Sequence, residues 1–235
     1  MSAARTTGAP TAGPATPRPS SLSSPSLGAA ALAVAGVMFI AYPAVRPWDD
    51  ESTVAGAIAA MSSGAWIASH LFGIIGFISV ALGLLGLRDL LAPTPAGPTA
   101  FAALVTGWIG VGLTLPYYGA EDFALHAMAV RAAGGDRFDL LAMVEEFRFA
   151  PVAATTFALG LLALAAGTVL AAVAIWRSGR LPRYSGVPFA VGFALFIPQF
   201  YTPAGVRIAH GVLVAVGCLW VALGLWRAGR RDTAR

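Results

Sequence analysis

The feature that most constrains the fold is a series of long apolar segments. The clearest of them, Val152 to Trp176, contains no charged side chain. About 20 consecutive apolar residues suffice for a helix to cross the hydrocarbon core of a bilayer. Only 11% of the chain is charged, whereas a typical soluble domain is about 25% charged. The sequence therefore predicts an all-α integral membrane protein.

Six segments have the composition expected of transmembrane helices. They cover residues 27–42, 64–87, 99–120, 152–176, 185–201 and 204–226. The third is expected to continue as a helix to Val130, with a kink at Pro116, because proline cannot donate the helical hydrogen bond. The predicted fold is a bundle of six transmembrane helices that forms one domain, residues 27–229.

The two ends of the chain are expected to lie outside this bundle. Residues 1–26 are rich in Ala, Pro, Ser, Thr and Gly, a composition typical of a disordered tail. Residues 230–235 form a short basic tail. The first apolar run is short enough to resemble the core of a signal peptide, but Tyr42-Pro43 stands where a small-residue cleavage site would be expected. We interpret this run as an uncleaved span.

A further helix is predicted between the third and fourth spans. Gly134-Gly135 breaks the chain, and residues 136–149 then read as an amphipathic helix. Its apolar side consists of Leu140, Leu141, Val144 and Phe147. Its more polar side carries Glu145, Glu146 and Arg148. This composition favours a helix that lies along the outer membrane surface and covers the mouth of a polar pocket.

The distribution of arginine predicts the orientation. All fifteen basic residues are arginine, and ten of them lie on the side of the two termini. The opposite side carries five arginines and nine acidic residues. By the positive-inside rule, both termini are cytoplasmic and the protein is placed in the cell membrane. The arginines stand at segment ends without interleaved aromatic residues, so no nucleic-acid partner is expected. The lipid bilayer is the expected partner, and a second copy or another membrane protein stays open.

Candidate functional residues concentrate at the end of the third span. Tyr118, Asp122 and His126 are spaced to share one helical face, and Tyr117 and Glu121 lie on the adjacent strip. Ionisable groups at membrane depth usually face a bundle interior or a watered cavity. The pattern predicts an outward-facing polar pocket at this point.

Residues of other spans are expected to complete the pocket. His70 and His210 each lie about six residues into an inward-running span, roughly 9 Å below the outer edge. Arg207 lies one helical turn above His210, and Gln199 ends the fifth span nearby. The residues expected to bind a ligand or relay protons are Tyr117, Tyr118, Glu121, Asp122, Gln199 and Arg207.

Three interpretations of this constellation stay open. In a structural role, Arg207 pairs with Glu121 or Asp122, and the histidines fix helix packing. Alternatively, the site binds zinc, copper, iron or a haem, to which imidazole and carboxylate are suited; its ligands would be His70, Asp122, His126 and His210. In the third interpretation, the group relays protons or holds a polar head group for a carrier or membrane enzyme, because histidine titrates near neutral pH.

No catalytic motif accompanies the site. The chain has no Gly-rich phosphate loop, no Gly-x-Ser-x-Gly turn and no paired glutamates within a span. The single cysteine, Cys218, excludes an intrachain disulfide. The sequence thus predicts a multi-pass membrane protein that binds a metal or a small polar ligand. The alternatives are a small proton-coupled transporter and a structural membrane subunit, and an enzyme is not favoured.

Overall fold

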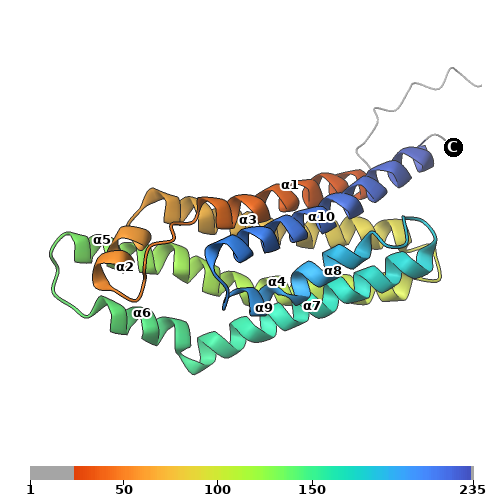
Figure 1. Cartoon of the computed structure of the whole chain (residues 1–235). Helices are drawn as coiled ribbons and strands as arrows, with labels where there is room; N and C mark the ends of the chain where they lie inside the picture. The colour runs from red at the N-terminus through yellow and green to blue at the C-terminus, as the bar shows by residue number, and fades with distance from the viewer. Residues whose placement is uncertain (1–23, 234–235) are drawn as a thin grey trace, which may run out of the picture.

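The computed structural model describes residues 24–233, and their regular structure is entirely helical. Figure 1 shows a bundle of long helices with a group of shorter helices at one end. In chain order the helices are α1 (Ser24–Val45), α2 (Val54–Met61), α3 (Gly64–Leu91), α4 (Gly97–Gly119), the π-helical turn η1 (Ala120–Leu125), α5 (His126–Ala133), α6 (Leu140–Phe149), α7 (Pro151–Ser178), α8 (Gly186–Ala194), α9 (Phe196–Gln199) and α10 (Ala204–Thr233). The predicted all-α class is confirmed for the described residues.

Five helices are long and apolar enough to cross a membrane. They are α1, α3, the continuous helix Gly97–Ala133 formed by α4, η1 and α5, then α7, and residues Ala204–Arg231 of α10. Their most apolar windows have mean hydropathy values between 1.5 and 2.4. These helices support a multi-pass membrane protein.

The fifth predicted span is a broken helix. Residues 185–201 form α8 and the short α9, which are separated at Leu195. The cause is Pro198, whose ring clashes with the carbonyl group four residues earlier, that of Ala194, the last residue of α8. Neither piece alone is long enough to span a bilayer. The count of six spans stays a prediction.

The terminal boundaries differ in part from those expected. Residues 1–23 of the predicted tail lie outside the described residues, but residues 24–26 already belong to α1. At the other end α10 continues to Thr233 without interruption. The described part of the basic tail is therefore an extension of the last helix.

Two hydrophobic cores hold the molecule together. The larger one lies within the bundle and includes fully buried Phe77, Val214 and Cys218. The second joins α2, α5 and α6 to the first turn of α3 and the end of η1, at the left of Figure 1. We call the part built from α2, α5 and α6 the cap. Leu140 and Val144 of α6 are buried there, so the apolar side of the predicted amphipathic helix packs on protein. Its position at a membrane surface stays a prediction.

Close helix packing depends on glycine where α4 meets α7. A Cβ atom on Gly110 would meet the backbone nitrogen of Leu164 and lie 2.8 Å from the carbonyl oxygen of Gly160. Backbone atoms cannot move aside as a flexible side chain can. The absence of a side chain at Gly110 therefore sets the separation of the two helices.

We expect Gly110→Ala to lower the free energy of unfolding by about 1–3 kcal/mol, because the added methyl group overpacks the α4–α7 contact. Gly112→Ala on the same helix is the control. No atom lies within 4 Å of its added Cβ, so a neutral effect or a gain of up to about 1 kcal/mol follows from helix propensity. Unfolding of the purified variants in detergent measures both. Equal stability of the two variants would contradict the packing argument.

Candidate ligand-binding cavity

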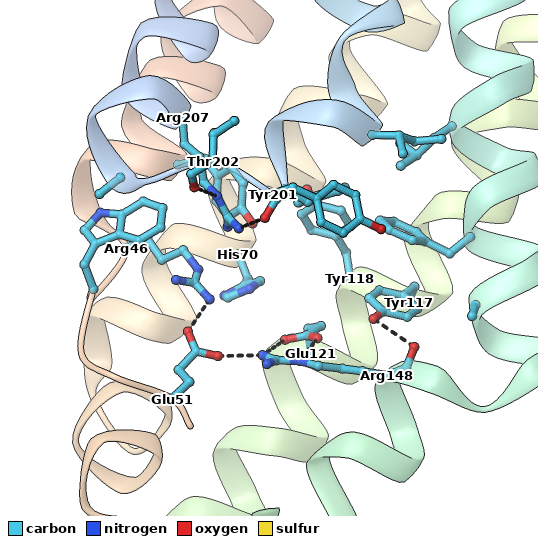
Figure 2. Close-up of a pocket in the computed structure, with 18 of the residues that line it drawn as sticks. Arg46, Glu51, His70, Tyr117, Tyr118, Glu121, Arg148, Tyr201, Thr202 and Arg207 are labelled. Carbon is cyan, nitrogen blue, oxygen red and sulfur yellow. Dashed lines mark hydrogen bonds and ion pairs between the residues drawn. The ribbon is translucent and has the colours of Figure 1, made fainter. Parts of the chain in front are cut away.

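A cavity of about 710 Å³ lies where the bundle meets the cap. Figure 2 shows side chains that converge on it from several helices. Its polar lining residues are Tyr42, Arg46, Asp49, Asp50, Glu51, His70, Tyr117, Tyr118, Glu121, Arg148, Tyr201, Thr202 and Arg207. Its apolar lining residues are Trp48, Phe149, Ala154, Phe157, Ala158, Leu161, Ile197, Phe200, Pro203 and Ala204. The predicted pocket residues Tyr117, Tyr118, Glu121, Arg207 and His70 thus meet at one cavity.

The π-helical turn η1 decides which carboxylate reaches the cavity. Pro116 does not end the helix, and the irregularity follows it at residues 120–125. A π turn leaves backbone carbonyl groups short of regular α-helical partners. The Trp66 indole N–H donates to the carbonyl oxygen of Glu121 at 2.8 Å. The wider turn places Glu121 in the cavity wall and leaves Asp122 outside it.

A chain of ion pairs joins the cap to the bundle. Arg148 of α6 donates to both carboxylate oxygens of Glu121, at 2.7 and 2.9 Å. The same guanidinium lies 2.9 Å from the carboxylate of Glu51, which also pairs with Arg46. Figure 2 shows Arg148 between the two carboxylates. Two-point contacts of this kind are among the strongest charge-assisted hydrogen bonds in proteins.

Two members of this ion-pair network, Glu51 and Arg148, lie outside the spanning helices, and their partners favour the charged form of each. Burial raises the pKa of Glu51, but Arg46 and Arg148 outweigh it and hold the pKa below its ordinary value of 4.5. Burial likewise lowers the pKa of Arg148, but Glu121 and Glu51 raise it above its ordinary value. Glu51 and Arg148 are therefore both ionised at neutral pH.

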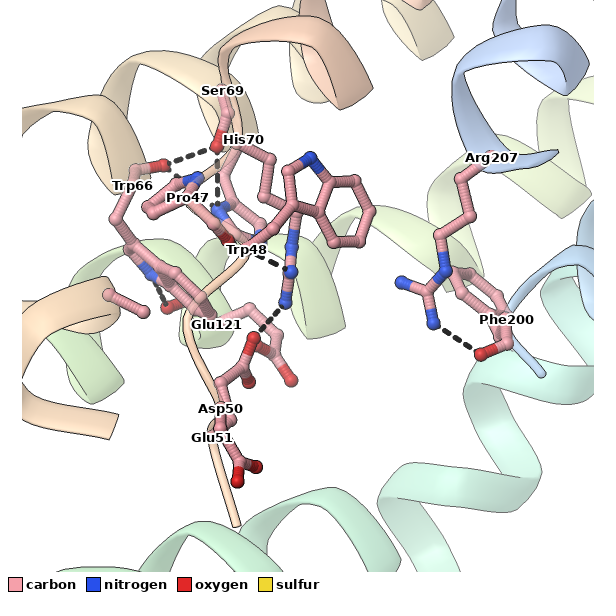
Figure 3. A network of polar contacts seen from close by, with 12 residues as sticks. Pro47, Trp48, Asp50, Glu51, Trp66, Ser69, His70, Glu121, Phe200 and Arg207 are labelled. Carbon is pink, nitrogen blue, oxygen red and sulfur yellow. Dashed lines mark hydrogen bonds and ion pairs between the residues drawn. The ribbon is translucent and has the colours of Figure 1, made fainter. Parts of the chain in front are cut away.

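Arg207 does not make the ion pair expected from the sequence. Its guanidinium donates to the carbonyl oxygens of Thr202, at 3.2 Å, and Phe200, as Figure 3 shows for Phe200. Among the described residues, the guanidinium also lies over aromatic rings, including that of Trp48, whose centroid is 5.3 Å from its central carbon. The predicted pair with Glu121 is wrong because Arg148 already occupies both of its oxygens. Among residues 24–233, no carboxylate lies within 4.0 Å of Arg207.

His70 and Tyr118 offer uncommitted polar atoms in this wall. The Nδ1 atom of His70 lies 2.9 Å from the carbonyl oxygen of Trp66. Because a carbonyl group only accepts, Nδ1 carries the proton and Nε2 of a neutral ring is an acceptor. Tyr118 is 3% exposed, and its hydroxyl has no hydrogen-bond partner among the described residues. The side chain of Tyr42 is a close polar neighbour of that hydroxyl, but their contact does not meet the geometry of a hydrogen bond.

Asp122 and His126 do not share the cavity with Tyr118, contrary to the predicted common face. The π turn changes the rotation per residue and so removes the regular four-residue spacing. Asp122 is completely buried, and neither carboxylate oxygen has a hydrogen-bond partner among the described residues. His126 donates from Nδ1 to the carbonyl oxygen of Met61, the last residue of α2, at 2.8 Å. His126 thus fastens the cap rather than lining the site.

Gln199 and His210 line a separate cavity of about 20 Å³ next to the first. The Nε2 atom of His210 donates to the carbonyl oxygen of Gly192 at 2.7 Å. Each of the three histidines is therefore bound to a different main-chain carbonyl group. The described residues contain no group of three or more His, Cys, Asp or Glu side chains that could hold a metal ion. The hypothesis of a shared metal or haem site gains no support from this arrangement.

Three important residues were not among the predicted site residues: Arg46, Glu51 and Arg148. A signal for Arg148 was present in the sequence. It follows Leu140 and Val144 at four-residue spacing, which places it on the buried face of α6 rather than with Glu145 and Glu146. Arg46 and Glu51 both lie in the loop after α1, where no periodic pattern indicates the direction of their side chains.

No protein-family model, no curated protein and no solved structure matches this chain.

We expect Arg148→Gln to lower the free energy of unfolding by about 3 kcal/mol, because it leaves the carboxylates of Glu121 and Glu51 partly buried without their shared cation. Thermal or denaturant unfolding in detergent measures the change. Arg137→Gln is the matched control, since Arg137 is exposed in the loop before α6 and should shift stability by less than about 0.5 kcal/mol. Similar losses in both variants would show that Arg148 has no special part in joining the cap to the bundle.

Proposed function

We propose that this multi-pass membrane protein binds a small anionic molecule, with a carboxylate or phosphate group, in the 710 Å³ cavity. The observation that carries the proposal is the Arg207 guanidinium, which lines the cavity without a carboxylate partner among the described residues. Carbonyl groups and aromatic rings do not neutralise its charge. A bound anion would do so, with the planar two-point geometry for which arginine is suited.

The charge balance of the inner wall supports an anion. The pairs of Arg46 and Arg148 with Glu51 and Glu121 are neutral in total. Within this buried group alone, Arg207 leaves an excess of one positive charge. Asp49 and Asp50 also line the cavity, but both are exposed. Solvent screens such charges far more than buried ones.

The Tyr118 hydroxyl and the Nε2 atom of His70 supply further groups that can bind the anion. The Tyr118 hydroxyl is buried in the cavity wall beside Tyr42 and makes no hydrogen bond within the described residues, so we assign it as a donor to an anionic oxygen. His70 lines the same cavity, and its Nε2 can accept from a protonated ligand oxygen. Such a convergence of a few polar groups in a largely apolar pocket is typical of small-molecule sites.

The cavity is proposed to open on the outer side of the cell membrane. The basic loop between α7 and α8 lies at the end of the bundle opposite the cap, together with the end of α3, which carries Arg88, and the end of α10 (Figure 1). Arginine-rich ends stay in the cytoplasm during insertion. The positive-inside rule therefore supports an outer location for the cap and for the cavity.

Single introduced cysteines test this orientation, since the native Cys218 is buried. We expect Glu145→Cys on the exposed side of α6 to react with a membrane-impermeant maleimide in intact cells. Arg177→Cys at the other end should react only after the cells are opened. Both positions are exposed. The reverse pattern of labelling would place the cap in the cytoplasm and overturn the proposed orientation.

Titration of the purified protein with acetate and with inorganic phosphate tests anion binding. We expect at least one of them to bind, and Arg207→Gln to weaken that binding about 10- to 100-fold, the range for a hydrogen bond to a charged group. Tyr118→Phe should weaken it about 2- to 10-fold without lowering the stability of the empty protein, because the buried hydroxyl makes no well-formed hydrogen bond there.

Matched substitutions outside the cavity serve as controls for these variants. Arg137→Gln and Tyr184→Phe remove the same groups from exposed positions, and both should bind as the wild type does. Calorimetry or ligand-observed NMR provides the dissociation constants. If neither anion binds, or if Arg207→Gln binds as tightly as the wild type, the proposed function is wrong.

A further inference from the structure

The cavity is lined by charged residues and by apolar residues. A small anion would contact only the charged ones. Beside the charged residues the cavity has an apolar wall. It consists of Ala154, Phe157, Ala158 and Leu161 from α7, with Ile197 and Phe200 from α9 and the turn after it. A small hydrated anion would leave this wall in contact with water, which is unfavourable for apolar surface.

The aromatic side chains of the apolar wall are held in place by packing on one another. The ring of Tyr117 stacks on Phe157, with 4.1 Å between the centroids. Phe157 in turn lies 5.8 Å from Phe200. The Phe200 ring also lies 5.8 Å from the Arg207 guanidinium, so the apolar wall reaches the proposed anion site.

The break between α8 and α9 exposes this wall. A continuous helix over residues 185–201 would have run beside α7 along its whole length. Instead the chain breaks after Ala194 and leaves α9 as one turn followed by a loop. α7 packs extensively along α4 and α8 but only sparingly against α9. The cavity therefore extends sideways between α7 and the segment that follows the break.

The rim on this side is apolar and aromatic. Phe149, at the end of α6, is 71% exposed, and Tyr201, after α9, is 87% exposed; both line the cavity. Val152, in the first turn of α7, is 80% exposed. Exposed aromatic residues at the ends of spanning helices are typical of the head-group region of a bilayer. The rim thus suits contact with lipid.

We propose that the anion bound here is the head of an amphiphile, a molecule with one acidic group and one apolar chain. This inference rests on the proposed function, since the acidic group is the anion at Arg207 and Tyr118. The chain lies against Phe157, Leu161 and Ile197 and leaves the cavity between Phe149 and Tyr201. A volume of about 710 Å³ is within the range of roughly 300–1,000 Å³ usual for small-molecule sites.

A series of ligands of increasing chain length tests the proposal. The full-length protein in nanodiscs of uncharged lipid is titrated with acetate, butyrate, hexanoate and octanoate, and with methyl, butyl and octyl phosphate. Empty nanodiscs correct for partitioning into lipid. For at least one of the two head groups, we expect the dissociation constant to fall along the series, by up to about fourfold for each methylene group buried. Equal affinity for all lengths would overturn the amphiphile and leave anion binding intact.

Two variants of α7 locate the chain. Ala158→Phe fills the space beside the apolar wall, so the affinity ratio of octanoate to acetate, or of octyl to methyl phosphate for a phosphate site, should fall at least tenfold. Ala166→Phe introduces the same side chain at an exposed position of α7 that does not line the cavity, and its ratio should equal that of the wild type. An unchanged ratio in Ala158→Phe would place the chain elsewhere and refute the proposal. The wild-type series is decisive even if Ala158→Phe does not fold.

Arg207→Gln separates failure of the two proposals. If the inference is correct, this variant weakens the short and the long ligands by similar factors, because it acts on the head group. If octanoate and octyl phosphate bind the wild type and the variant equally, chain contacts alone hold them and the head-group assignment is wrong. If none of the seven ligands binds the wild type, both the amphiphile and the anion site are refuted.

Discussion

The shared ion pairs of Arg148 are the interaction on which the cavity depends. The guanidinium holds Glu121 of the π turn on one side and Glu51 of the loop after α1 on the other. These groups come from three separate parts of the chain, and all three are largely buried. Desolvation of three charges is costly, and the two-point contact with Glu121, the second carboxylate and the pair of Glu51 with Arg46 offset that cost. The network therefore fixes the cap over one end of the bundle and fixes the shape of the cavity beneath it.

Much of the fold could be predicted from the sequence because the bilayer imposes a simple rule on composition. Apolar length identifies α1, α3, α4, α7 and α10 without knowledge of their packing. The same rule fails for residues 185–201, where composition alone cannot show that Pro198 breaks the helix at Ala194. Hydropathy measures the transfer of side chains into lipid, whereas the break arises from a steric clash in the backbone.

The position of the site could be predicted from the sequence, but the hydrogen-bond and ion-pair partners of its residues could not. The residues Tyr117, Tyr118, Glu121, His70 and Arg207 do line one cavity. Their partners could not be read from helical periodicity, because the π turn changes the spacing after Gly119. Asp122 is the clearest case, since regular spacing would have placed it beside Tyr118 but it lies outside the cavity. Arg148 was misassigned for a different reason: its charge suggested solvent, although its spacing from Val144 indicated the buried face.

The π turn also has a geometric consequence for the cap. A regular helix turns by about 100° per residue, so the additional residue in the turn fixes the angle at which α5 leaves the bundle. That angle brings His126 to the end of α2, while Trp66 of α3 holds the widened turn from the other side. Removal of a single residue from this turn would rotate everything after it and separate the two contacts. The π turn thus sets the rotation of α5 relative to α4, and with it the orientation of the cap.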